Sequence, residues 1–179
     1  MEVAGCVARF TSVLAFSLLF FDAPSADGET PPGLQLPPRG ALAIYLPGPA
    51  KLALDKLEKP ECQAVLLDFR DADGRLLKED LDATGMTPPK FFASLRFVDG
   101  SHASLCDRPR VAAGANPGTP VVAICMRTFG RMRFEDPTLA ADVLIHEMLH
   151  ALGLPEAPLT PDAPTSEEIT RQVVRRCGP

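Results

Sequence analysis

The residues best suited to chemistry are two histidines four positions apart, in the segment His146-Glu147-Met148-Leu149-His150. On a helix, residues at this spacing lie on one face, one turn apart, so both imidazoles can bind one Zn²⁺. Glu147, directly after the first histidine, points elsewhere and can take a proton from a metal-bound water. The pattern predicts a hydrolytic zinc site with His146 and His150 as ligands and Glu147 as general base.

The element that must position these residues has clear end signals. Asp136 suits the N-cap, Pro137 suits the first helical position, and Gly153 followed by Pro155 suits the end. The pattern predicts a helix from 137 through about 152. This helix is apolar nearly all round, so we expect it to be buried at the centre of the domain. Burying two histidines and a glutamate without partners is costly, which favours a bound metal ion.

The segment from His146 to Glu156, HEMLHALGLPE, resembles the long zinc motif of the metzincin peptidases. The resemblance implies that the chain turns at Gly153 and that the third zinc ligand stands at position 156. Metzincins usually carry histidine there, but a carboxylate is a normal zinc ligand, so Glu156 is the expected third ligand. No methionine follows Met148, so the methionine turn of metzincins is absent. The stretch from 125 to 177 is also similar to small exported bacterial proteins described as metallopeptidases.

Other residues could supply the third ligand instead. In a thermolysin-like arrangement a glutamate on a downstream helix binds the metal, and Glu167 or Glu168 would serve. Glu168 also forms a capping-box pair with Thr165, which gives it a structural role. Asp162 and His102 are more remote candidates.

The N-terminal sequence has the pattern of an export signal. Arg9 precedes an apolar run at 10–21, and small residues and proline follow at 23–26, which is typical of a secretory signal peptide covering 1–26. The run is too short to span a bilayer, and no other segment comes close, so we expect no membrane helix. Residues 27–40 are rich in proline and glycine and predict a flexible lead-in, followed by one domain at 41–179. The mature protein is therefore expected to be secreted or periplasmic.

The cysteine count fits an exported protein. Removal of Cys6 with the signal peptide leaves Cys62, Cys106, Cys125 and Cys177, an even number that predicts two disulfides. Three pairings are possible. We favour Cys106 with Cys125, because the loop between them contains turn residues, and this leaves Cys62 with Cys177.

The charge balance limits the partners. The net charge of −5 argues against nucleic acid, which requires a basic face. We expect a monomer that acts on a peptide or protein substrate.

The remaining pattern predicts the fold class. Residues 50–69 look helical in two pieces around Pro60, and a short capped helix is expected at 165–177. The prolines at 155–164 predict an extended polyproline segment, and 127–135 is a mixed segment. Strands are expected at 92–98 and 120–126, with a return strand at 101–105 after the turn signal Asp99-Gly100. We expect an α+β fold: a small, mainly antiparallel sheet packed on a central zinc-binding helix in one disulfide-stabilised domain.

These observations together predict a secreted zinc metallopeptidase. One alternative is a non-catalytic exported zinc-binding or scaffold domain. Another is a deformylase-like amidase, since peptide deformylases carry the same helix motif with a cysteine ligand from an upstream strand. The sequence does not identify the residue that would stabilise the developing oxyanion. The candidates are Tyr45, His102, Arg127, Arg131 and Arg133.

Overall fold

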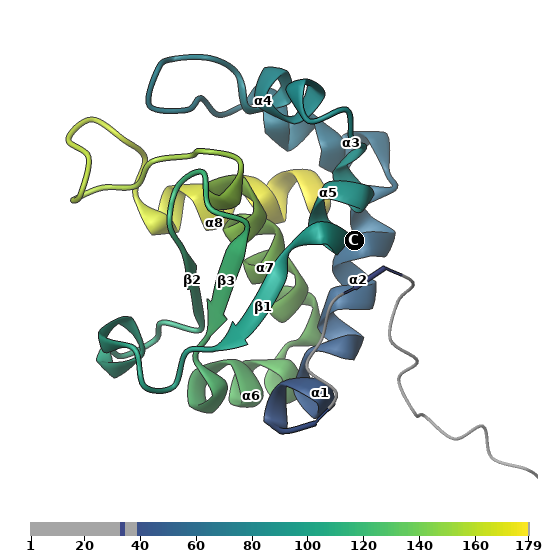
Figure 1. Cartoon of the computed structure of the whole chain (residues 1–179), viewed down its shortest axis with the longest axis vertical. Coiled ribbons are helices and arrows are strands. Elements are labelled where there is room, and N and C mark those ends of the chain that lie inside the picture. The colour runs from purple at the N-terminus through teal and green to yellow at the C-terminus, as the bar shows by residue number, and fades with distance from the viewer. Residues whose placement is uncertain (1–32, 35–38, 179) are drawn as a thin grey trace, which may run out of the picture.

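The structure is a computed structural model that describes residues 33–34 and 39–178. The expected signal peptide at 1–26 and most of the lead-in at 27–40 lie outside the described residues. Within the described part the fold is α+β, with eight α-helices, two short 3₁₀ helices and a three-stranded sheet (Figure 1). In chain order the elements are α1 (Ala41–Tyr45), α2 (Pro47–Leu57), α3 (Pro60–Gln63), η1 (Ala64–Leu67), α4 (Leu77–Ala83), α5 (Pro88–Ser94), β1 (Arg96–Asp99), η2 (Ser104–Asp107), β2 (Ala113–Ala115), β3 (Val121–Ile124), α6 (Met126–Glu135), α7 (Pro137–Ala151) and α8 (Ser166–Cys177).

The sheet is mixed, not mainly antiparallel as expected. Its order is β1-β3-β2, with β1 parallel and β2 antiparallel to β3. The strand expected at 92–98 is shorter, because Pro88 opens helix α5, which buries Phe91 and Phe92. The return strand expected at 101–105 is wrong: Asp99 accepts a hydrogen bond from the Ser101 N–H, and the turn leads into η2. The antiparallel partner of β3 is instead β2, which the sequence analysis did not predict.

Helix α7 is the central element, as predicted. Pro137 occupies its first turn, and the Asp136 carboxylate accepts a hydrogen bond from the Leu139 N–H at 2.9 Å. Figure 1 shows α7 behind the strands, and it packs against α2, α6, α8 and β2. The helix buries most of its apolar side chains together with four polar ones: Asp142, His146, Glu147 and His150. One of them, Asp142, pairs with the buried Lys56 of α2 at 2.5 Å.

Two segments around α7 differ from expectation. Residues 127–135, expected to be mixed, belong to α6, which starts at Met126 and buries Phe129 and Gly130. The segment 155–164 is not an extended polyproline stretch. It folds back on itself, because the Ala157 N–H donates to the Pro164 carbonyl at 3.1 Å and Asp162 adopts a positive φ of 67°.

Both favoured disulfides are confirmed. Cys62 is bonded to Cys177, and Cys106 is bonded to Cys125. The helical pieces around Pro60 and the capping box of Thr165 and Glu168 at the start of α8 are confirmed as well. A search of the described residues finds no helix with the length and apolar character needed to cross a membrane.

Candidate metal centre

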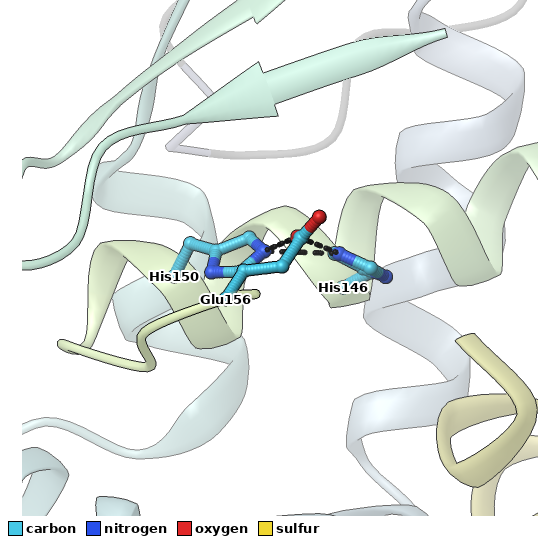
Figure 2. Close-up of side chains that lie close together, drawn as sticks. All are labelled: His146, His150 and Glu156. Atoms are coloured by element: carbon cyan, nitrogen blue, oxygen red, sulfur yellow. Dashed lines mark hydrogen bonds and ion pairs between the residues drawn. The ribbon is translucent and has the colours of Figure 1, made fainter. Parts of the chain in front are cut away.

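The structure brings His146, His150 and Glu156 together, as Figure 2 shows. The two histidine Nε2 atoms are 3.0 Å apart, and the Glu156 Oε2 atom lies 2.9 Å from that of His150 and 3.6 Å from that of His146. Three ligands at about 2.0–2.1 Å from a tetrahedral zinc ion would be separated by about 3.3 Å. The three atoms are therefore spaced so that this group could hold a metal ion.

Glu156 reaches the group because the chain turns sharply after α7. Gly153 has a φ of 120°, a conformation that side chains with a Cβ rarely adopt. The Gly153 N–H donates to the His150 carbonyl at 2.8 Å, and the Leu154 N–H donates to the Leu149 carbonyl at 3.1 Å. This glycine turn ends the helix and returns Glu156 to the face that carries the histidines. The turn at Gly153 was an expectation from the metzincin resemblance.

Hydrogen bonds orient both imidazoles. The His150 Nδ1 atom lies 2.8 Å from the Leu154 carbonyl, which can only accept, so Nδ1 carries the proton. The His146 Nδ1 atom lies 3.0 Å from the Thr170 hydroxyl of α8, which can accept in the same way. In each neutral ring Nδ1 then carries the proton, and Nε2 holds a lone pair that faces the other two members of the group. This tautomer is the one that metal binding through Nε2 requires.

Glu147 lies beside the cluster rather than in it. Its side chain is buried, and its Oε2 atom has no hydrogen-bond partner among the described residues. Burial raises the pKa of Glu147, while the nearby imidazoles and the Ala115 backbone N–H of β2 oppose the rise. A buried carboxylate oxygen without a partner is rare, and it is suited to accept a proton from a bound water.

The charges within the cluster fit a cation. Burial by itself would raise the pKa of Glu156, but the two imidazoles outweigh burial and lower this pKa to about 2. Burial disfavours protonation of His150, yet the Glu156 and Glu147 carboxylates outweigh burial and raise the pKa of His150. The two carboxylates thus favour positive charge at this position, and a metal ion bound to the same atoms would supply it.

The alternative ligands do not join this cluster. Glu168 is occupied at the start of α8, where its carboxylate accepts from the Thr165 N–H and hydroxyl at 2.8 Å. Glu167 pairs with Arg171 on the same helix. His102 is exposed in the turn after β1, and Asp162 is exposed in the loop before α8. Among the described residues, the group that could hold a metal contains none of these four.

The candidates for an oxyanion stabiliser lie elsewhere. Tyr45 of α1 stacks edge-on against Phe134 with the Arg133 guanidinium over both rings. Arg127 and Arg131 line a separate pocket, described below. The sequence analysis missed Thr170 and the Ala115 N–H. Thr170 precedes the buried Val173 and Cys177 by three and seven residues, so the helical spacing of α8 places it on the inward face, and this is the signal that could have indicated it.

The arrangement supplies two neutral nitrogens and one carboxylate oxygen for a cation, with a buried carboxylate next to them. These donor types could serve as three protein ligands of one metal ion. Comparison with protein-family models, with curated proteins and with solved structures gave no match.

Proposed function

We propose that the protein is a zinc-dependent metallopeptidase that acts outside the cytoplasm. The observation that carries the proposal is the buried Glu147 carboxylate, with an oxygen that has no partner among the described residues, beside the His146, His150 and Glu156 cluster. A purely structural zinc site uses four protein ligands and has no need of such a carboxylate. The two disulfides suit an oxidising compartment, in agreement with an exported protein.

Each residue has a distinct role in this proposal. His146, His150 and Glu156 hold the ion, and when bound the ion lowers the pKa of a coordinated water and polarises the carbonyl under attack. Glu147 takes the proton from that water and returns it to the leaving amine. Burial raises the pKa of Glu147. A general base whose pKa lies nearer the working pH can both accept a proton from the water and donate it to the leaving amine.

A peptide substrate is supported by strand β2. It is an edge strand of the sheet, and among the described strands it pairs only with β3. An extended peptide can add to such an edge through main-chain hydrogen bonds. Ala115, at the end of β2, lies next to Glu147, so a peptide along this edge would pass the metal site.

The structure argues against a deformylase-like site. Such a site needs a cysteine thiolate from an upstream strand as a ligand. Cys125, which follows β3, is bonded to Cys106 and has no thiolate to offer.

Zinc analysis of the purified oxidised chain tests the ligands. We expect one zinc ion per wild-type chain, loss of zinc in Glu156→Ala, and retention in Glu168→Ala. The second variant is a matched control, because it removes a glutamate that lies in the capping box and not in the cluster.

Glu147→Gln tests the chemistry. It should keep zinc but lower peptide hydrolysis by about 10²–10⁴-fold, because the neutral amide cannot take the proton. A peptide library and a panel of acyl amides, assayed in parallel, separate a peptidase from an amidase. Equal hydrolysis by wild type and Glu147→Gln, or a wild-type chain that binds no zinc when metal is supplied, would refute the proposal.

A further inference from the structure

A pocket lined by arginines lies at the opposite end of α7 from the metal cluster. Its volume is about 470 Å³. It lies between the loop that leads into β2, one face of α6, and the first turn of α7. Four arginines line it, two from the loop and two from α6: Arg108, Arg110, Arg127 and Arg131. We call it the arginine pocket.

The charge of the arginine pocket is positive and uncompensated. Two acidic residues, Glu135 and Asp136, also line it, so the four guanidinium groups leave an excess of two positive charges. Asp136 is already engaged, because its carboxylate caps α7. No ion pair joins any of the four arginines to an acidic side chain in the part of the chain that the structure describes. Guanidinium groups gathered without partners in a concave site are suited to bind an anionic group in a forked geometry.

Arg110 adopts a conformation that carries a cost. Its φ is 72°, in the left-handed region that bulky side chains seldom occupy. Glycine would fit this position without strain, yet the chain carries an arginine that lines the pocket. Strained residues of this kind cluster at binding sites, where the strain holds a side chain in place.

One face of α7 connects the arginine pocket to the metal cluster. Leu139 lines the pocket, and Val143, His146 and His150 follow it at spacings of four, three and four, which places all of them on one stripe of the helix. Leu139 and Val143 are only half-buried, whereas the rest of the helix from Ala140 onward is buried. The partly accessible side of α7 therefore runs from the pocket through Leu139 and Val143 toward the buried histidines.

Strand β2 follows the same course beside α7. The chain leaves the arginine pocket at Arg110, forms β2 three residues later, and reaches Glu147 at Ala115. Helix α7 and β2 pack against each other, and Figure 1 shows β2 rising from the end of the molecule where α6 lies. The open edge of β2 thus connects the same two places as the stripe on α7.

We infer that the arginine pocket selects peptide substrates that carry an acidic group about three residues from the bond that is cleaved. Leu139 and His146 are seven positions apart, which corresponds to about 10 Å along the helix axis, and an extended peptide covers that distance in about three residues. The acidic group is a carboxylate or a phosphorylated side chain, since a guanidinium fork binds both. This inference rests on the proposed function, because it concerns the substrate of the same site.

Binding measured apart from cleavage tests the inference. The probes are peptide libraries of about ten residues that differ only at one central position, which is Asp, phosphoserine or Asn. Binding is measured on the zinc-loaded, oxidised Glu147→Gln chain, so that no probe is consumed. We expect the Asp and phosphoserine libraries to bind about tenfold more tightly than the Asn library, and their ratio shows which anion is preferred.

The arginine variants are made in the same background. Arg131→Gln, and separately Arg127→Gln, should reduce the preference for acidic peptides to about threefold or less. Arg133→Gln is the matched control, because it removes the same charge from the same helix but from the face that stacks on Tyr45 and Phe134. It should keep the full preference.

The outcomes separate the inference from the function on which it rests. Equal binding of the Asp and Asn libraries, or a preference that survives both pocket variants, overturns the inference even if the wild-type chain cleaves peptides. Acid-dependent binding combined with a wild-type chain that cleaves no peptide overturns the proposed function, and with it any substrate role for the pocket. Acid-dependent binding together with faster wild-type cleavage of acidic peptides supports both.

Discussion

Replacing Thr170 with valine should weaken zinc binding while leaving every ligand in place. The threonine hydroxyl lies 3.0 Å from the Nδ1 atom of His146 and is half-buried between α7 and α8. Valine has the same shape but cannot accept, so the Nδ1–H of His146 loses its partner. No hydrogen bond from α8 then holds the His146 ring in the orientation and tautomer that bind zinc.

The expected size of the effect follows from the cost of an unpaired buried donor. That cost is about 1–3 kcal/mol, and each 1.4 kcal/mol corresponds to a factor of ten in affinity. The unpaired Nδ1–H of His146 also destabilises the metal-free protein, although there the imidazole can rotate to find another partner. This part of the cost does not reduce zinc affinity. We therefore expect zinc affinity to fall about tenfold to a hundredfold, the usual range for loss of an outer hydrogen-bond partner of a metal ligand.

Thr165→Val is the matched control. It removes a hydroxyl from the N-cap of α8, where the Thr165 oxygen accepts from the Glu168 N–H at 3.3 Å. Losing this cap should cost about 1 kcal/mol of folding stability with no change in zinc affinity. Zinc affinity is measured by competition with a chromophoric chelator at fixed pH, and stability by urea unfolding of the metal-free chains. If Thr170→Val binds zinc as tightly as wild type, the orienting role assigned to α8 is wrong.

Two further predictions concern stability. Lys56→Met should lower the free energy of unfolding in urea by about 3–5 kcal/mol, because it leaves Asp142 buried without its partner. The double variant with Asp142→Leu should recover most of this loss. A double variant as unstable as the single one contradicts the argument. The Arg176 guanidinium holds the pKa of Asp68 below its ordinary value, so ionised Asp68 stabilises the fold above about pH 4, and this stabilisation is lost as the pH falls through the lowered pKa. Arg176→Met should therefore be less stable than wild type near pH 7, and the difference should shrink as the pH falls below about 4 through the lowered pKa of Asp68. A stability difference that does not change with pH would show that the pair has no such role.

The sequence predicted the elements that have strong end signals. Asp136 with Pro137 at one end and Gly153 at the other delimit α7, and Thr165 with Glu168 open α8. These signals act locally, through a few backbone hydrogen bonds, so they can be identified without knowledge of the rest of the fold. The predicted ligands came together for the same reason, since two of them share a helix and the third follows its C-terminal turn.

The elements that the sequence did not predict depend on distant contacts. Helix α6 lacks a side-chain N-cap and contains Gly130, a poor helix former, so its stability depends on packing, with Phe129 and Gly130 buried. Strand β2 is only Ala113–Ala115, and its residues have low strand propensity, so its pairing with β3 defines it. Phe91 and Phe92 favoured a strand by type, but Pro88 starts a helix there.

The Cys62–Cys177 disulfide has a consequence for the maturation of the metal centre. It fastens the last residue of α8 to α3, at a sequence separation of 115, and the same helix carries the hydroxyl that orients His146. Without the bond, α8 is held by two buried apolar side chains, its N-cap, and the hydrogen bonds of Gln172 and Arg176 to Asp68. For the exported zinc protein that we propose, the chain should therefore oxidise before it retains zinc firmly, so that the metal centre is completed only after export.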